Sequence, residues 1–325
     1  MRKILIVCGA RPNFIKIAPL IRALKELPSL FSISLVHTGQ HFDNNMNKVF
    51  FKQLNIPAPD YFFDIYGGTH SYQTGKIMIE FEKVILKEKP NIVLVIGDVN
   101  STMACAITSK KCGYKLGHIE SGLRSGDMEM PEEINRIITD SIADYFFVTE
   151  KSAINNLLKE GKSKNQIFFV GNIMIDSLKN EAQIVKKGAA INEKIVEIVK
   201  KYPNYILVTI HRPSNVDSKK DLLNLLGILD SASSLFEIIF PVHPRTKKQF
   251  EKFNINLPSK INFIDPVPYR EFVFLMMYSK CVITDSGGIQ EETTALKKTC
   301  FTLRNNTERP ITCEIGSNKL IGNYP

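Results

Sequence analysis

Short runs of apolar residues recur along the whole chain, and a polar loop and a helical pattern follow most of them. Most runs are continuously apolar rather than alternating, which is typical of parallel strands covered on both faces. We predict eleven such strands, at residues 4–8, 33–37, 92–96, 116–119, 146–149, 168–170, 206–210, 238–242, 261–264, 282–284 and 299–303. Helical periodicity lies between them, for example at residues 71–87, 101–111 and 191–201. This alternation predicts an α/β fold with doubly wound parallel sheets.

Eleven strands are too many for one sheet in a chain of 325 residues, so the pattern predicts two domains. A polar stretch rich in Lys and Asn, residues 171–204, separates about six strands from about five. We place the boundary at Gly171–Asn172, which gives Rossmann-like domains of residues 1–171 and 172–325. In this fold class ligands bind at the carboxyl ends of the strands. We therefore expect the two sheets to face each other across a ligand-binding cleft.

Composition and charge narrow the classes of function. Hydrophobic residues make up 44% of the chain, which is enough for sizeable cores. The net charge of +9 suits an anionic ligand, but the lysines are scattered, so nucleic-acid binding gains little support. The six cysteines form no C-x-x-C pair, which favours reduced, mostly buried thiols over disulfides or a metal site. Because the chain has no apolar run of roughly 20 residues and no signal-peptide pattern, we expect a cytoplasmic protein.

The most informative segment follows the apolar run 281–283 and reads TDSGGIQEE. A turn of small residues, Ser286-Gly287-Gly288, lets the backbone approach a ligand, and the free N–H groups of the helix that follows point at it. Glu292, one turn later, is placed to hold two ribose hydroxyls. We interpret the segment as a cradle for the diphosphate and ribose of a nucleotide. An ordinary glycine-rich βα turn is the alternative.

Basic residues follow the first predicted strand. Arg11 and Lys16 are placed to meet phosphate, although surface charges on an amphipathic helix would look the same. The chain has no G-x-G-x-x-G motif, so we expect neither a nicotinamide nor a flavin cofactor.

Histidines end two later strands, His211 before Arg212 and His243 two residues before Arg245. One such histidine is usually structural, but two at equivalent strand ends favour a phosphate-lined site. The segment 268–272, which ends in Phe272, suits a wall against a base, and residues 304–310 add a third basic loop.

Carboxylates also follow predicted strands, where packing rarely needs a charge. Asp98 comes after the strand at 92–96, and Glu120 comes after the strand at 116–119. Asp98 can equally cap the helix expected from Ser101, whereas Glu120 is harder to explain as a cap. Glu132 begins another helix, a position where acids are common for electrostatic reasons alone.

Taken together, these segments resemble the non-hydrolysing UDP-N-acetylglucosamine 2-epimerase family, whose members share the two-domain glycosyltransferase-B-like fold. The resemblance rests on eight blocks in order, from residue 9 to residue 310: GARPNFIKIAPL, GDVNST, HIESGLR, PEEINR, VTIHR, PVHP, TDSGGIQEE and RNNTERP. Each block alone is modest, but the ordered set spans nearly the whole chain and is highly specific.

The resemblance implies that UDP is eliminated across C1–C2 of the sugar to give a 2-acetamidoglucal, and that UDP then adds back with protonation from the opposite face. This chemistry needs no redox cofactor and no metal. The implied acid/base residues are Asp98, Glu120 and Glu132, assisted at the diphosphate by Arg136 and His211. The implied binding residues are Ser286, Gly287 and Gly288 for the diphosphate, Glu292 for the ribose, and Arg11, Lys16, His243 and Arg309 for the remaining charge.

The chain departs from the family pattern in several places. Many members have an activator site for a second substrate molecule that uses a Gln-His-x-Gln segment, but here the segment reads Gln40-His41-Phe42-Asp43. A carboxylate near an anionic diphosphate is unfavourable, which puts inherited allostery in doubt. The GARPNFIK form of the first loop also differs from the commonest version, and can accompany a different sugar. Family members usually run several tens of residues past the TERP block, so we expect the usual C-terminal helices to be missing.

Several alternative functions share these motifs. A relative acting on a 2,3-diacetamido uronic acid UDP-sugar would share every block, and a hydrolysing 2-epimerase would admit water to the glucal. An inactive UDP-sugar-binding protein would keep the segment 286–292 but lose the carboxylates, whereas a sugar transferase would not need three of them. We expect a UDP-sugar as ligand, a homodimer, and no nucleic-acid or membrane partner.

Overall fold

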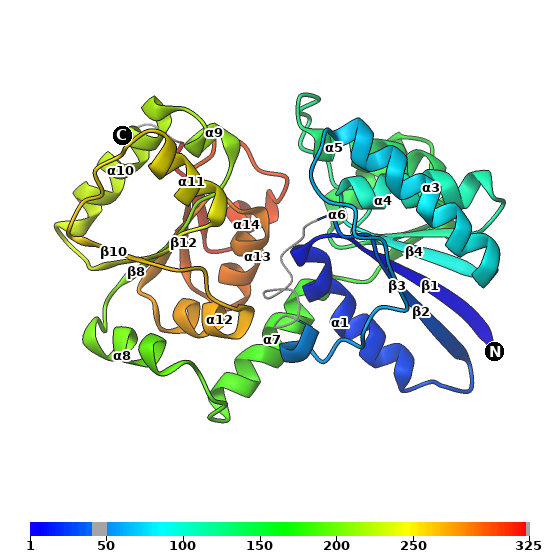
Figure 1. The fold of residues 1–325 in the computed structure, drawn as a ribbon, viewed down its shortest axis with the longest axis horizontal. Helices are drawn as coiled ribbons and strands as arrows, with labels where there is room; N and C mark the ends of the chain where they lie inside the picture. The colour runs from blue at the N-terminus through cyan, green and yellow to red at the C-terminus, as the bar shows by residue number, and fades with distance from the viewer. Residues whose placement is uncertain (41–50, 323–325) are drawn as a thin grey trace. The chain divides into compact units, whose positions relative to one another are not determined.

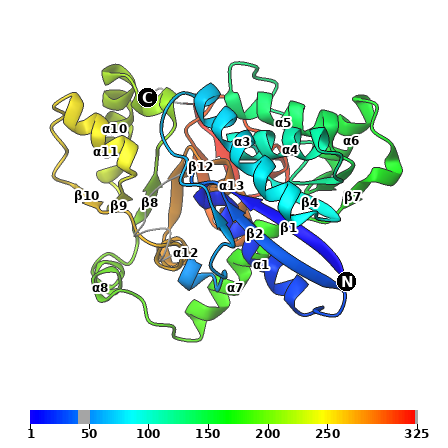
Figure 2. The same cartoon turned by 45° about the vertical axis from the view of Figure 1, so that its right-hand side comes forward.

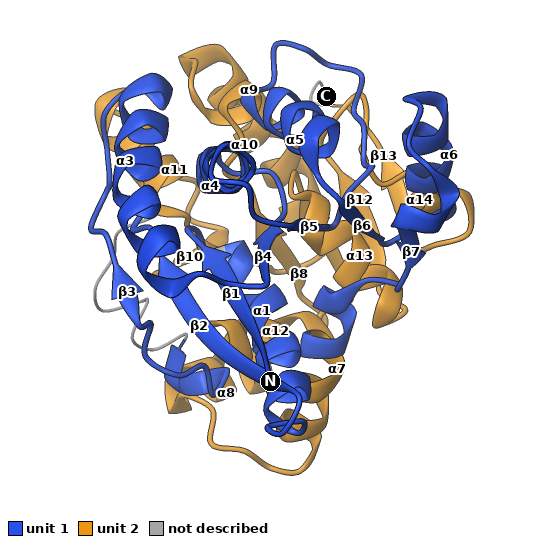
Figure 3. Cartoon of the chain, turned by 90° about the vertical axis from the view of Figure 1, so that its right-hand side faces the viewer, with its two compact units in different colours: residues 1–177 blue, residues 178–325 orange. Residues whose placement is uncertain are grey.

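The structure is a computed structural model that describes residues 1–40 and 51–322, apart from the side chain of Arg11. The chain divides into two compact units, Met1–Ser177 (unit 1) and Leu178–Pro325 (unit 2), which Figure 3 colours separately. The division falls within helix α7 (Ile173–Lys186), a little beyond the boundary predicted at Gly171–Asn172.

Unit 1 is built on a parallel sheet that has seven strands among the described residues, in the order β3-β2-β1-β4-β5-β6-β7. These strands are β1 (Arg2–Cys8), β2 (Phe31–His37), β3 (Tyr61–Phe62), β4 (Ile92–Ile96), β5 (Leu116–Ile119), β6 (Tyr145–Val148) and β7 (Ile167–Phe169). The helical elements before α7 are α1 (Arg11–Lys25), α3 (His70–Glu88), α4 (Asn100–Lys111), α5 (Pro131–Ile142), α6 (Lys151–Lys159) and the 3-10 turn η1 (Lys164–Gln166). Helix α1 covers one face of the sheet, and α3, α4 and α5 cover the other (Figures 1 and 2).

Unit 2 has a second parallel sheet, with six strands among the described residues, in the order β10-β9-β8-β11-β12-β13. These strands are β8 (Ile206–Thr209), β9 (Ile238–Pro241), β10 (Ile261–Ile264), β11 (Cys281–Thr284), β12 (Thr299–Thr302) and β13 (Asn318–Leu320). After α7, its helices are α8 (Glu193–Lys201), α9 (Pro213–Val216), α10 (Lys219–Ser233), α11 (Pro244–Lys252), α12 (Tyr269–Tyr278), α13 (Gly287–Ala295) and α14 (Ile311–Glu314).

All eleven predicted strands are present, and the predicted fold class is confirmed. We expected six strands in unit 1 and five in unit 2, one fewer than each unit has among its described residues, because the sequence pattern missed β3 and β13. Both are short edge strands, with two residues in β3 and three in β13. A strand that pairs on one side only needs no long apolar run, so the hydrophobic pattern does not mark it.

The cores lie between each sheet and its helices. In unit 1, Leu5 and Val93 of the sheet pack in one buried cluster with Ile77 and Phe81 of α3. In unit 2, the corresponding cluster joins β8 and β9 to the buried leucines of α10 and to Phe250 of α11. Both sheets reverse their strand order once, between β1 and β4 and between β8 and β11. The carboxyl ends of the strands at such a reversal are where this fold class binds ligands.

The six cysteines are free thiols. Four of them, Cys8, Cys105, Cys281 and Cys300, are buried, and burial raises the pKa of Cys300 to about 11 even though hydroxyl hydrogen bonds oppose it. Among the described residues, no helix has both the length and the apolar character to cross a membrane.

Candidate active site

Glu120, the residue directly after β5, has a strained backbone conformation. Its φ is +70°, in the left-handed region that residues with a side chain seldom adopt and that costs on the order of 1 kcal/mol or more. Its side chain is 5% exposed and forms an ion pair with Lys16 of α1, which is buried as well. Buried charges persist only when they are paired. The ammonium of Lys16 therefore stabilises the carboxylate form of Glu120.

The turn after β4 passes directly beside this ion pair. Gly97 has a φ of +70°, and a Cβ built there would lie 3.3 Å from both Glu120 Oε2 and Lys16 Nζ. Any side chain at this position would meet the charged pair on a backbone that disfavours it. Glycine at residue 97 thus allows the Asp98 turn and the Glu120 side chain to lie close together.

Asn13 of α1 connects two of these strand ends. Its Nδ2 donates to the carbonyl of Ile96 at 3.1 Å, and its Oδ1 accepts the N–H groups of Gly9 and Ala10, each at 3.1 Å. The turn after β1 is thereby held against the end of β4. Sequence reasoning missed Asn13, although its position in the GARPNF block is a usable signal.

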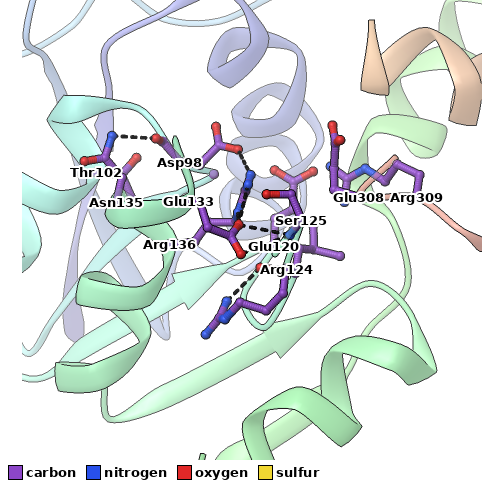
Figure 4. Close-up of polar contacts among 12 residues, drawn as sticks. Asp98, Thr102, Glu120, Arg124, Ser125, Glu133, Asn135, Arg136, Glu308 and Arg309 are labelled. Atoms are coloured by element: carbon purple, nitrogen blue, oxygen red, sulfur yellow. Dashed lines mark hydrogen bonds and ion pairs between the residues drawn. The ribbon is translucent and has the colours of Figure 1, made fainter. Parts of the chain in front are cut away.

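Asp98 lies against α5, where Arg136 holds it (Figure 4). The guanidinium donates to Asp98 Oδ2 at 2.5 Å and to Glu133 Oε2 at 2.7 and 2.9 Å. Arg136 is buried, whereas the Asp98 side chain is 34% exposed and so remains open to a ligand. Helix α4 has Val99 as its N-cap, so the alternative that Asp98 caps this helix is wrong.

The buried acid on the first turn of α5 is Glu133, which sequence reasoning missed. Its carboxylate accepts the N–H groups of Ser125 and Gly126 at 3.0 Å. Burial opposes the charged form, but these N–H groups and Arg136 outweigh burial and lower the pKa of Glu133. Its i,i+3 spacing from Arg136 was a signal for this pairing. The neighbouring Glu132, the predicted acid, is exposed on the first turn of α5.

In unit 2, Ser286, Gly287 and Gly288 form the turn from β11 into α13, with Ser286 as the N-cap. The N–H groups of a first helical turn have no partner within the helix and attract anions. The first of these glycines is required by packing, since a Cβ on Gly287 would lie 2.3 Å from Glu308 Oε1. This glycine turn, residues 286–288, has the form of an anion-binding helix start.

Glu308, another residue that sequence reasoning missed, is surrounded by arginines. Arg304 donates to it at 2.7 Å and Arg212 lies at 3.5 Å. Burial opposes ionisation, but Arg304, Arg212 and Arg309 together push the pKa of Glu308 far below its usual value. The predicted binding residue Arg309 is itself buried, with Nε 3.3 Å from a carboxylate oxygen of Glu291.

The two predicted histidines of unit 2 lie side by side, with ring centroids 5.1 Å apart. His211 is positioned by the buried Asp285, which accepts its backbone N–H at 3.0 Å and that of Arg212 at 2.8 Å. The His211 ring is 39% exposed, with Nδ1 3.3 Å from Asp285 Oδ1. His243 is the N-cap of α11, and its Nδ1 accepts the N–H of Arg245 at 3.2 Å.

Glu292 is a buried carboxyl without a cation beside it among the contacts the structure describes. Burial raises its pKa to about 7; the hydroxyl of Tyr269, which donates to it at 2.7 Å, acts in the opposite direction, and nearby Glu291 adds to the increase. Burial and the Glu292 carboxylate keep the pKa of Tyr269 well above its usual value. Phe272 follows Tyr269 by three residues on α12 and is half-buried.

The structure thus places the predicted residues in two groups, each within one unit. Unit 1 brings Lys16 and Glu120 together beside Gly97, and brings Asp98 and Arg136 together. Unit 2 places the two histidines and the glycine turn after β8, β9 and β11, and Glu292 on α13. The side chain of Arg11, and residues 41–43 of the expected activator segment, lie outside what the structure describes. Among described residues, no three His, Cys, Asp or Glu side chains are grouped to hold a metal ion.

Two parallel α/β sheets, with charged residues at the strand ends of one and a glycine turn at a strand end of the other, define a protein of the glycosyltransferase-B-like class. The sequence model of the UDP-N-acetylglucosamine 2-epimerase family matches residues 22–325. The chain belongs to this family, as the sequence motifs predicted.

Individual relatives agree with this assignment. A UDP-N-acetylglucosamine 2-epimerase of Methanocaldococcus jannaschii is 45% identical, over 98% of this chain and 88% of the relative. A UDP-2,3-diacetamido-2,3-dideoxy-D-glucuronate 2-epimerase of Pseudomonas aeruginosa is 43% identical over the same shares. The crystal structure of the Methanocaldococcus jannaschii enzyme in complex with UDP-GlcNAc and UDP has a TM-score of 0.91, at 44% identity, over 99% of this chain and 89% of that one. The predictions of an epimerase and of its fold are therefore confirmed.

Proposed function

We propose that the chain interconverts UDP-N-acetylglucosamine and UDP-N-acetylmannosamine by eliminating UDP and adding it back. One observation carries the proposal: the buried Lys16–Glu120 ion pair, on a strained backbone, beside the turn that presents Asp98. A strained residue persists only where the surrounding structure enforces it, and such residues cluster at active sites. Family membership supplies the substrate class.

The reaction requires proton transfer at C2 of the sugar from both faces. In the forward direction a base removes the C2 proton, the C1–O bond breaks, and UDP leaves with the bonding electrons. The resulting 2-acetamidoglucal then accepts UDP at C1 and a proton at C2 on the opposite face. We propose Asp98, Glu120 and Glu132 for these transfers, because each is a carboxyl at a strand end or helix start of unit 1. Positioned acids and bases of this kind contribute about 10²–10⁴-fold to a rate.

The other predicted residues have binding roles in this proposal. The glycine turn 286–288 binds the diphosphate with its N–H groups, and Glu292 accepts the ribose hydroxyls. Arg136 and His211 stabilise negative charge on the leaving diphosphate. Phe272 contacts the base, and the cations that complete the site are Arg11, Lys16, His243 and Arg309. The homodimer expected from the resemblance stays a prediction that light scattering of the purified protein can test.

The relative from Pseudomonas aeruginosa favours a second candidate, an epimerase of a 2,3-diacetamido uronic acid UDP-sugar. Its 43% identity is close to the 45% of the first relative, so overall similarity does not separate the two sugars. The additional carboxylate and acetamido group of that substrate would need partners that UDP-N-acetylglucosamine does not.

Proton NMR in deuterium oxide with both UDP-sugars, tested separately, distinguishes these functions. We expect UDP-N-acetylmannosamine to form from UDP-N-acetylglucosamine with deuterium at C2 and without added nicotinamide or metal. Full retention of hydrogen at C2 during turnover would rule out elimination. Accumulation of free N-acetylmannosamine would indicate a hydrolysing enzyme, and turnover of the diacetamido substrate alone would support the second candidate.

A further inference from the structure

A buried histidine that has no role in the proposed reaction lies behind the turns that carry Asp98 and Glu120. His118 is in the middle of β5 and is fully buried. Its Nδ1 lies 2.6 Å from Asp140 Oδ1, and its Nε2 lies 2.8 Å from the carbonyl oxygen of Gly97. Both ring nitrogens therefore face an oxygen at hydrogen-bonding distance.

The nature of these two oxygens determines the protonation state of the ring. A carbonyl oxygen only accepts, so Nε2 must carry a hydrogen. Asp140 is an ionised carboxylate: burial opposes its charge, but His118, Arg124 and the N–H of Gly122 together lower its pKa. Its other oxygen, Oδ2, accepts the Gly122 N–H at 2.9 Å and lies 2.8 Å from Nη1 of Arg124. Because an ionised carboxylate also only accepts, Nδ1 must carry a hydrogen too.

We propose that His118 is a positioning residue that donates from both ring nitrogens and so holds the Asp98 and Glu120 turns in their reactive arrangement. Since it concerns the same reaction, this inference rests on the proposed function. His118 touches neither carboxylate directly, and it acts through the backbone of their neighbours.

The hydrogen bonds of His118 and of its partner Asp140 reach both turns. On one side, His118 fixes the carbonyl of Gly97. The N–H of the same residue donates to the Ile119 carbonyl at 3.0 Å. Asp98 follows Gly97 directly. On the other side, Asp140 fixes the N–H of Gly122, two residues after Glu120. The strained φ of Glu120 and the positive φ of Gly97 are the conformations that such a clamp has to maintain.

Stability alone is a poor reason for this arrangement. Well-packed apolar residues often replace a buried ion pair without loss of stability, because the desolvation of two charges offsets their attraction. Positioning is a better reason, since a misplacement of about 1 Å at a reacting group can cost about 10²-fold in rate.

NMR of the imidazole nitrogens tests the protonation state without relying on turnover. We expect both His118 nitrogens to carry hydrogen in the intact protein, because each faces an oxygen that accepts. In Asp140→Asn, the new amide NH₂ donates to Nδ1 while its oxygen still accepts from Gly122, so the hydrogen bonds survive and the ring becomes neutral. A neutral ring in the unaltered protein would overturn the proposal.

Kinetics tests positioning. His118→Asn removes the bond to Gly97, and we expect kcat to fall about 10²-fold with UDP affinity within about twofold. Asp140→Asn, which keeps the bonds, should lose less than tenfold. Ile77→Ala opens a cavity in the core of the same unit, at a buried residue of α3, and is the control for destabilisation; it should keep its kcat. A lower melting temperature in His118→Asn without a fall in kcat would overturn the positioning role.

The two proposals fail in different ways. If the unaltered protein turns over no UDP-sugar, the proposed function fails. The NMR chemical shifts of the Asp98 and Glu120 backbone amides then test whether His118 positions the two turns. Unchanged shifts in His118→Asn would overturn this positioning role, and shifts changed at both residues would support it.

Discussion

The two units share a sheet architecture but differ in how they stabilise carboxylates at the strand ends. In unit 1 the acids have cations beside them: Glu120 has Lys16 and Asp98 has Arg136. In unit 2, Glu292 has the hydroxyl of Tyr269, and Asp285 accepts mainly backbone N–H groups. These two acids of unit 1 are therefore held by cations, whereas Asp285 and Glu292 of unit 2 are held mainly by neutral donors; Glu308 of unit 2, beside Arg304, is an exception.

This difference separates two kinds of chemistry. A carboxylate paired with a cation stays ionised and can accept a proton from a weak carbon acid. A buried carboxyl without a cation is costly in its charged form, so a ligand that brings hydroxyl donors to it is bound more tightly. We therefore expect substitutions in unit 1 to change kcat, and those in unit 2 to change affinity for UDP.

The largest effect is expected at the paired acids of unit 1. Glu120→Gln keeps the shape of the side chain but cannot take up a proton, so kcat should fall by about 10²-fold or more. Asp98→Asn and Glu132→Gln should each lose a similar factor if all three acids act in the reaction. Single-turnover kinetics with UDP-N-acetylglucosamine is the measurement.

Calorimetry of UDP binding is the control for these variants. UDP affinity should change little, because the residues proposed for the diphosphate and the ribose, 286–288 and Glu292, belong to unit 2. If Glu120→Gln abolished UDP binding, Glu120 would be a binding or structural residue, and the separation between the units would fail.

The next effect concerns the glycine turn of unit 2. In Gly287→Ala the added methyl would lie 2.3 Å from Glu308 Oε1. Arg304 donates to the other oxygen of this carboxylate, Oε2, and Arg212 lies 3.5 Å from Oε1. One of these groups must move, and we expect UDP to bind about 10²-fold more weakly as the diphosphate contacts are lost. Gly227→Ala is the matched control, because residue 227 lies within α10 and has nothing within 4 Å of the added methyl. Its UDP affinity should stay unchanged; equal weakening in both variants would contradict the proposed role of residue 287.

These predictions rest on residues that the sequence identified to different degrees. The strands and the glycine turn were predictable, because apolar runs and small-residue turns are local signals. The Lys16–Glu120 pair joins residues 104 positions apart, so their contact depends on the order of β1, β4 and β5 in the sheet. The same holds for His118, which reads as one more residue of a buried strand until Asp140 and Gly97 are placed around it. Glu132 and Glu133 look alike in sequence, and only the register of α5 separates the exposed acid from the buried one.

A moderate effect should appear in the pH dependence of UDP binding. Glu292 has a pKa raised to about 7 by burial, and ribose hydroxyls donate best to its ionised form. Binding therefore gains strength as pH rises through 7, and we expect about tenfold higher affinity at pH 8 than at pH 6. Calorimetry at both pH values checks this, with Glu292→Gln as a control that should show weaker and nearly pH-independent binding.

The stability of the folded protein should change in the opposite direction. The folded state holds the Glu292 proton more tightly than the unfolded state does, so this group's contribution falls as pH rises from 4.5 to about 7. A UDP affinity that falls over the same range would show that Glu292 binds in its protonated form.

The smallest effect concerns Gln40, the described part of the expected activator segment. Its Oε1 accepts two hydrogen bonds from Ser101, one from the backbone N–H at 2.9 Å and one from the hydroxyl at 2.6 Å. This oxygen is therefore bound to the first turn of α4. Gln40→Ala should therefore cost about 1 kcal/mol of stability, as the loss of a helix cap does, and should leave a hyperbolic rate curve hyperbolic. Stopped assays over a wide range of UDP-N-acetylglucosamine concentrations measure the curve, and thermal denaturation measures the stability. A Hill coefficient clearly above one that Gln40→Ala abolishes would show that unit 1 binds a second substrate molecule, and nucleotide binding would then no longer belong to unit 2 alone.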